Sequence, residues 1–279
     1  MSKSQTISRS IFTLLSNNKA NKAIAPILLL SLSLWGAIEL KPQIVNAATP
    51  QDTPPELKNI ISKIDEAANR KDIQSVMQIL SPNYNNSDGL TRENLEKGLN
   101  QLWKRYPNLK YNTEIQSWQK DNQALVAETI TNITGNTKDN TSFKIKSTIR
   151  SRQRFENQQL VQQEILAENT QITSGQKPPT LEIKLPESVR SGENYNFDVI
   201  VKEPLGNDLL IGNAVEEPIK NNTYLNPTAL QLQPLNAGGI FKVGQPIKGV
   251  NSQWLSAVIV RDGGLTMITQ RLKIVDVKK

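Results

Sequence analysis

The sequence predicts an α+β fold in which three helices pack on an antiparallel sheet, followed by an all-β sandwich domain. Three observations predict it. Apolar residues recur at three- and four-residue steps from residue 56 to residue 106, and the period then drops to two. Glycine and paired prolines break the pattern at 173–179. Short alternating segments fill residues 180–277.

Residues 1–47 have the layout of an export signal peptide. Basic residues precede an apolar run, Ala23 to Ala37, and Val45-Asn46-Ala47 supplies small residues for a signal peptidase. We expect cleavage before Ala48, a polar lead-in over 48–55, and a location in the periplasm, the thylakoid lumen or the extracellular space. The alternative is an uncleaved anchor, but the run is shorter than the roughly 20 residues that span a bilayer core. No stable membrane insertion is expected after cleavage.

Composition excludes several chemistries. The chain has no histidine and no cysteine, so a Ser-His-Asp triad, a thiolate nucleophile, a disulfide and a tetrahedral zinc site are excluded. The leader carries a net +4 of the chain's +7, which leaves +3 for the exported part. We therefore expect no nucleic-acid partner. A Walker loop and a GxGxxG fingerprint are both missing from the sequence, and we expect no cofactor and no metal.

The first domain, predicted over 56–172, opens with three helices. Apolar residues within 57–68 form one stripe at helical spacing, and Pro55 suits a first turn. Asp72 is placed to cap a second helix, and Thr91 is placed to cap a third. Pro107 ends the third helix.

Four strands are predicted after the helices, because polar and apolar residues begin to alternate. They cover 109–116, 123–133, 141–155 and 159–169.

This order of elements resembles the nuclear transport factor 2-like superfamily, which includes ketosteroid isomerase-like and SnoaL-like members. The resemblance rests on Ala67-Ala68-Asn69-Arg70-Lys71-Asp72 at the first helix joint, on the Leu80-Ser81-Pro82-Asn83-Tyr84 exit, and on the elements that follow. With the leader and the second domain, the chain is similar to exported cyanobacterial members. The resemblance implies a cone of three helices against a curved antiparallel sheet, often with a pocket at its open end. It implies no single function.

The second domain, predicted over 180–277, contains six or seven short strands. Tyr195 to Val201 alternates, Trp254 to Arg261 is apolar on both faces as in a central strand, and Asp262-Gly263 is a strong hairpin turn. The layout is similar to immunoglobulin-like sandwiches without their disulfide. The preceding linker, 173–179, lacks periodic apolar residues and is expected to be the most protease-sensitive joint.

Catalytic candidates follow from the resemblance. Isomerase-like members use a carboxylate near the first strand and a phenol donor, and Asp88 and Tyr84 come closest by position. Glu128, inside an apolar strand, is a second possible pocket carboxylate. The alternative is that Asp88 belongs to an Asp-Gly turn and that Tyr84 packs in the core.

Aromatic residues could line a ligand pocket or fill the core. They are Trp103, Tyr106, Tyr111 and Trp118. Four acidic residues of the second domain lack the spacing of a calcium loop and are expected to be solvated loop charges. They are Glu203, Asp208, Glu216 and Glu217.

One strand carries a row of basic residues at even positions, so all of them share one face. The basic row is Lys144, Lys146, Arg150, Arg152 and Arg154. It could bind an anionic partner or pair with the next strand. A three-residue connection, 156–158, would set Arg150 opposite Glu164 and Lys146 opposite Glu168, leaving Arg152 and Arg154 without partners.

The sequence thus favours an exported, non-enzymatic protein that binds another protein or a small molecule. A homodimer through the N-terminal sheet is one expected arrangement. The alternative is an isomerase- or dehydratase-type enzyme that uses a carboxylate and a tyrosine in the pocket. A weaker third hypothesis is an adaptor for an anionic polymer, bound through the basic row.

Overall fold

The computed structural model describes residues 52–137, 143–206, 208–220, 223–224 and 228–276. The predicted leader and its cleavage site lie outside these residues. The described chain divides into two compact units. The helix-bearing unit holds 52–172 together with 219–224, and the all-strand unit holds 173–218 and 228–276.

Three helices open the helix-bearing unit. They are α2 (Pro55–Arg70), α3 (Ile73–Ile79) and α4 (Arg92–Arg105). Both predicted caps are confirmed, because Asp72 accepts from the Ser75 backbone N–H at 3.1 Å and Thr91 accepts from that of Asn94 at 3.2 Å. The apolar stripe of α2 is buried as predicted, with Leu57 fully buried.

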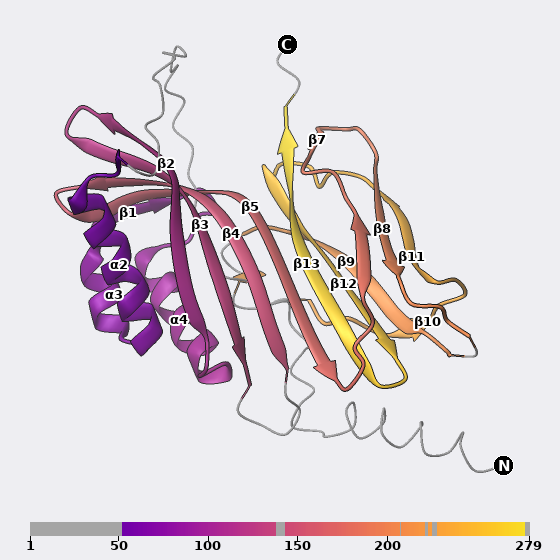
Figure 1. The fold of residues 1–279 in the computed structure, drawn as a ribbon. Coiled ribbons are helices and arrows are strands. Elements are labelled where there is room, and N and C mark those ends of the chain that lie inside the picture. The colour runs from indigo at the N-terminus through magenta and orange to yellow at the C-terminus, as the bar shows by residue number, and fades with distance from the viewer. Residues whose placement is uncertain (1–51, 138–142, 207, 221–222, 225–227, 277–279) are drawn as a thin grey trace. The chain divides into compact units, whose positions relative to one another are not determined.

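The same unit contains five strands, and Figure 1 shows the three helices gathered on one side of the four long ones. The strands are β1 (Leu80–Asn86), β2 (Lys110–Asp121), β3 (Ala124–Asn136), β4 (Lys144–Glu156) and β5 (Gln159–Gly175). The long strands run in the order β5-β4-β3-β2, and β1 pairs with β5 in parallel. Along β4, odd positions are buried and most even positions are exposed, so one face of the sheet meets the helices.

Strand β2 ends this strand order, and helix α2 covers part of its unpaired edge. Asn69 donates from Nδ2 to the Tyr111 carbonyl and accepts from the Tyr111 N–H, both at 2.9 Å. The amide side chain thereby imitates the backbone of a neighbouring strand. Two residues further along β2, the Thr113 N–H also points away from β3, and Asp65 accepts a hydrogen bond from it at 2.6 Å.

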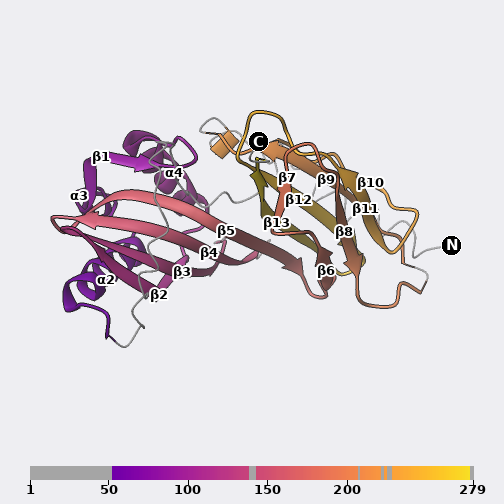
Figure 2. The ribbon, with the colours of Figure 1, turned by 90° about the horizontal axis from the view of Figure 1, so that it is seen from above.

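The all-strand unit consists of two sheets that face each other (Figure 2). Strands β9 (Ile211–Pro218), β10 (Gln233–Pro234), β12 (Ser252–Arg261) and β13 (Gly264–Val275) run in the order β10-β9-β12-β13, with β7 (Ser188–Arg190) parallel to β13. Strands β6 (Leu181–Lys184), β8 (Tyr195–Val201) and β11 (Gly239–Gly244) run in the order β11-β8-β6.

The core of this unit comes from both sheets. Phe197 and Val199 of β8 meet Leu255, Ala257 and Ile259 of β12, and all five are fully buried. Two predictions are confirmed. Strand β12 is central, between β9 and β13, and it is buried on both faces. The β12–β13 hairpin has a two-residue loop, since Arg261 pairs with Gly264. An immunoglobulin-like relationship stays a prediction.

The expected fold class, an α+β protein with an N-terminal three-helix cone before the sandwich, is wrong. The described residues are largely β and mostly antiparallel sheet, and the helices hold only 16, 7 and 14 residues. The four long strands of the helix-bearing unit hold 12, 13, 13 and 17 residues, and three of the four exceed the predicted lengths. The helical periodicity predicted where the helices lie, but it gave no information on the amount of β-sheet around them.

The predicted flexible linker is a tight backbone crossing. Gly175, with φ at +97°, lies so close to the β12–β13 turn that an added Cβ would be 2.3 Å from the Gly263 carbonyl oxygen. An added Cβ on Gly264 would be 2.5 Å from the Ser174 carbonyl oxygen. The Lys177 N–H donates to the Gly263 carbonyl at 2.9 Å. We call these contacts the glycine crossing. They hold the backbone at 174–177, and the protease sensitivity of the 173–179 joint stays a prediction.

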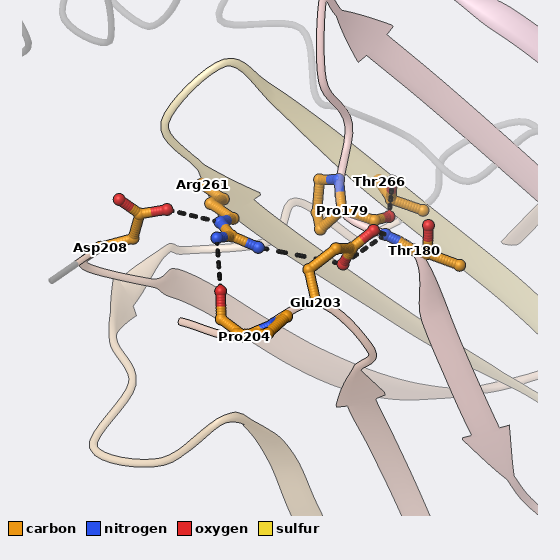
Figure 3. Close-up of polar contacts among 7 residues, drawn as sticks. All are labelled: Pro179, Thr180, Glu203, Pro204, Asp208, Arg261 and Thr266. Carbon is orange, nitrogen blue, oxygen red and sulfur yellow. Dashed lines mark hydrogen bonds and ion pairs between the residues drawn. The ribbon is translucent and has the colours of Figure 1, made fainter. Parts of the chain in front are cut away.

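Arg261 and its partners hold the chain just after the glycine crossing, near Thr180 (Figure 3). Its guanidinium donates to Asp208 at 2.7 Å and to the Pro204 carbonyl at 2.8 Å, and lies 3.9 Å from Glu203. Glu203 accepts from the Thr180 N–H at 2.9 Å, and hydrogen bonds from the side chain and the backbone of Thr180 lower the pKa of this carboxyl group. Two of the four acidic residues predicted to be solvated loop charges therefore belong to an arginine clamp.

The other two acidic residues are also misassigned. Glu216 and Glu217 lie on β9, and Glu217 is almost fully buried, accepting from the Thr228 N–H at 2.7 Å. Glu216 pairs with Lys242 at 2.8 Å. The sequence prediction assigned neither residue to a strand, because the strand predicted in this region ended at Val215.

Candidate functional site

A cavity of about 140 Å³ lies inside the helix-bearing unit, between the helices and the buried face of the sheet. Its walls are mainly apolar and come from α2, α3, α4 and every strand of the unit. The apolar lining is Ile61, Ile64, Ala68, Val76, Leu80, Leu95, Leu99, Trp103, Ile133, Ile149 and Leu160. The polar lining is Asp65, Tyr84, Tyr111, Thr113, Thr131, Gln153 and Gln163.

Asp65 is the carboxylate of the cavity. It accepts from the Thr113 N–H at 2.6 Å and from the Thr113 hydroxyl at 2.7 Å, and the Thr113 and Thr131 hydroxyl oxygens are 3.0 Å apart. Burial raises the pKa of Asp65, against the lowering effect of these hydrogen bonds. The sequence contained a signal for this residue, because Asp65 follows Ile61 by four positions and precedes Ala68 by three on the buried stripe.

Two phenols and two amides supply the remaining polar groups. The Tyr84 hydroxyl donates to Gln163 Oε1 at 3.1 Å, and Trp103 Nε1 donates to the Tyr111 hydroxyl oxygen at 2.9 Å. Burial raises the pKa of both phenols, so both stay protonated at neutral pH. Gln153 is 7% exposed, and its Oε1 has no hydrogen-bond partner among the described residues.

The structure brings together some of the predicted site residues. Of the four aromatic candidates, Trp103 and Tyr111 line the cavity, whereas Tyr106 is buried outside its lining and Trp118 lies on β2 beyond it. Tyr84 also lines the cavity.

The predicted catalytic carboxylates are elsewhere. Asp88 accepts a hydrogen bond from the Tyr224 hydroxyl, and it does not line the cavity. Glu128 lies on the outer face of β3 and pairs with Arg152 at 2.7 Å. Tyr84 lines the cavity without either carboxylate, although the charge of Asp88 is near enough to add to the effect of burial in raising the pKa of the Tyr84 phenol.

A shallower groove runs along α2 and β2 outside the cavity. Asp65, Ile61, Tyr111 and Thr113 line both spaces, so this part of the wall separates the cavity from the groove. Among the described residues, no three acidic side chains gather in a way that could hold a metal ion. No described helix is both long enough and apolar enough to span a membrane.

The basic row lies on the outer face of β4, opposite the cavity side of the sheet. Arg152 bonds Glu128 at 2.7 Å and Glu164 at 3.0 Å, and Arg154 bonds Glu156 at 2.7 Å and also Asp121. Within the described residues, Lys144, Lys146 and Arg150 take part in no ion pair. Two of the five positive charges expected to form an anion-binding surface are thus paired with carboxylates.

The predicted pairing of Arg150 with Glu164 and of Lys146 with Glu168 is wrong, because Glu164 bonds Arg152 and Glu168 is buried. The β4–β5 connection has two residues, Asn157 and Gln158, both with positive φ, instead of three. The resulting shift by one position would by itself turn Glu164 to the buried face. The buried positions of β5 change parity twice, between Leu160 and Ile165 and again between Ile165 and Glu168, so Glu164 lies on the outer face beside Arg152 while Glu168 points to the buried face.

We therefore expect energetic coupling between residues 152 and 164 rather than between 150 and 164. A double-mutant cycle with Arg152→Ala and Glu164→Ala, measured by urea unfolding, should give a coupling of about 0.5–1 kcal/mol. The matched cycle with Arg150→Ala should give about zero. A larger coupling between residues 150 and 164 would instead support the pairing predicted from a three-residue turn.

Asp65 should make stability depend on pH. Because its folded pKa lies above the ordinary value of 3.8, its contribution to stability is greatest below 3.8 and declines as the pH rises through the folded pKa. Asp65→Asn does not titrate and should keep the bond from the Thr113 N–H. The unfolding free energies of both proteins are measured in urea from pH 3.5 to 7.5. The value for the variant minus that for the wild type should increase as the pH rises. A difference that does not change with pH would contradict this prediction.

Comparison with known proteins is informative for the all-strand unit alone. Residues 176–275 match a family described as a domain of unknown function, DUF8623. A structure of Bd1075 from Bdellovibrio bacteriovorus is similar at 13% identity and a TM-score of 0.30, over 39% of this chain and 40% of that protein. No curated protein matches the chain. The family match lies in the all-strand unit and does not include residues 55–172. The resemblance of 55–172 to the nuclear transport factor 2-like superfamily therefore stays a prediction.

Proposed function

We propose that the protein is a non-enzymatic binding protein whose helix-bearing unit takes up a small, mostly apolar molecule. The observation that carries the proposal is the mainly apolar cavity with the buried Gln153 oxygen in its wall, which has no partner among the described residues. Buried polar groups without partners are rare in folded proteins, and a ligand is one of the things that can satisfy them.

The cavity volume limits the ligand. Pockets for drug-sized molecules enclose about 300–1,000 Å³, whereas an apolar cavity of about 150 Å³ is enough for benzene. At about 140 Å³, the cavity favours a single-ring or short branched molecule over a polycyclic one.

The alternative, an isomerase- or dehydratase-type enzyme, has less support. Both oxygens of Asp65 already accept from Thr113, and Tyr84 already donates to Gln163. A general base needs a free lone pair directed at its substrate, and an oxyanion donor needs a free proton. Export of the protein and its partners stay predictions.

The test is to alter the cavity volume in both directions. Toluene is titrated into the protein, and binding is followed by NMR and by the rise in Tm that a ligand of the folded state causes. Ala68→Leu should fill the cavity and weaken toluene binding more than tenfold with little loss of stability, while Leu99→Ala should admit butylbenzene. If toluene binds Leu99→Ala but not the wild type, the native cavity is a packing gap and the proposal fails.

A further inference from the structure

Three residues form one row across the buried face of the sheet. Trp118 of β2 pairs with Ala127 of β3, and Ala127 pairs with Gln153 of β4. Neighbouring strands are about 4.8 Å apart, so the backbones of Trp118 and Gln153 are about 10 Å apart. Ala127 is fully buried and has only a methyl group, and the two long side chains flank it.

Both long side chains of this row contain a buried polar atom with no partner among the described residues. These atoms are Trp118 Nε1 and Gln153 Oε1. An indole N–H can only donate, and an amide oxygen can only accept. The row therefore presents one unused donor and one unused acceptor on either side of a single methyl group.

We propose that this row binds the hydroxyl group of the ligand, whose oxygen accepts from Trp118 Nε1 and donates its proton to Gln153 Oε1. The inference rests on the proposed function and names the ligand class: a neutral, single-ring alcohol. A hydroxyl is the simple functional group that donates and accepts at one oxygen. Gln153 lines the cavity and Trp118 lies beyond its lining, so the hydroxyl sits at the margin and the ring points inward.

The electrostatics of the cavity favour a neutral ligand over an anion. Asp65 contributes a carboxylate to the wall, and no lysine or arginine is among the described residues that line the cavity. A carboxylate-bearing ring such as benzoate would lose its hydration without gaining a cation.

The test compares benzyl alcohol with toluene, which differ only in the hydroxyl. We expect the alcohol to bind about tenfold more tightly, since it makes two buried hydrogen bonds that toluene cannot make. The chain has four tryptophans, and Trp118→Phe assigns the indole N–H signal of Trp118. That signal should shift with benzyl alcohol and stay in place with toluene.

Two variants test the two ends of the row separately. Gln153→Leu and Trp118→Phe should each reduce the ratio of the affinities for benzyl alcohol and toluene several-fold, toward one. Trp254→Phe is the matched control, because Trp254 lies on β12 of the all-strand unit and does not line the cavity. If Gln153→Leu does not fold, the Trp118→Phe result decides.

The outcomes separate this inference from the proposed function. Equal affinity for benzyl alcohol and toluene overturns the hydroxyl row and leaves the cavity function intact. An alcohol preference that survives both variants also overturns the row, because the hydroxyl group then binds elsewhere in the cavity. Failure of the wild type to bind either compound overturns both proposals.

Discussion

Gly175→Ala is expected to lower the unfolding free energy of the all-strand unit by about 3 kcal/mol or more. A positive φ costs an alanine about 1 kcal/mol, and forcing a methyl group into a filled space costs about 1–3 kcal/mol more. In the glycine crossing that methyl group would lie 2.3 Å from the Gly263 carbonyl oxygen and 2.5 Å from the Gly264 Cα. Both contacts are with backbone atoms, which cannot rotate away. Urea unfolding followed by tryptophan fluorescence measures the loss.

Gly192→Ala is the matched control for this prediction. Gly192 belongs to the same unit and has φ at +86°, but an added Cβ there meets nothing within 4 Å. It should therefore show only the conformational cost of about 1 kcal/mol. If the two variants lose the same stability, the close approach of the two backbones is not real.

Arg261→Met is expected to destabilise the all-strand unit by about 2 kcal/mol, since hydrogen bonds to charged groups contribute about 1.5–3 kcal/mol. The substitution keeps the apolar stem and removes the guanidinium, whose side chain is 15% exposed. Asp208 and the Pro204 carbonyl then lose a donor, and Glu203 loses its nearby positive charge. Thermal unfolding in 50 mM and 500 mM salt would measure the effect, and much of the loss should persist at high salt because the Arg261 side chain is mostly buried.

Arg190→Met is the control for the clamp. Arg190 contacts Glu193 at 3.5 Å, and its side chain is 67% exposed. Exposed pairs of this kind contribute about 0–1 kcal/mol. A loss at Arg190 as large as that at Arg261 would show that arginine removal, not the clamp, causes the destabilisation.

Features set by neighbouring residues were predictable from the sequence. The caps at Asp72 and Thr91 depend on a side chain and the backbone three residues later. The Asp262-Gly263 turn fixes its own hairpin. The five basic residues of β4 share a face because strand alternation requires it.

Features that depend on distant parts of the chain were not predictable in this way. The partner of Arg152 depends on a turn that is one residue shorter than expected and on a change of parity in β5. The rigidity at Gly175 comes from a turn some ninety positions later, although the local sequence suggested a linker. Asp65 was passed over because one charge on an apolar stripe carries little weight until the residues opposite it are known.

The bond from Tyr224 to Asp88 has a consequence for the order of events during synthesis. The two residues are 136 positions apart, and Tyr224 belongs to a short stretch of the helix-bearing unit that lies beyond Pro218. A ribosome adds about 5–20 residues per second. The first 172 residues are therefore complete several seconds before Tyr224 exists. During that interval the unit has to persist without its last segment, and Asp88 without the hydroxyl group that donates to it.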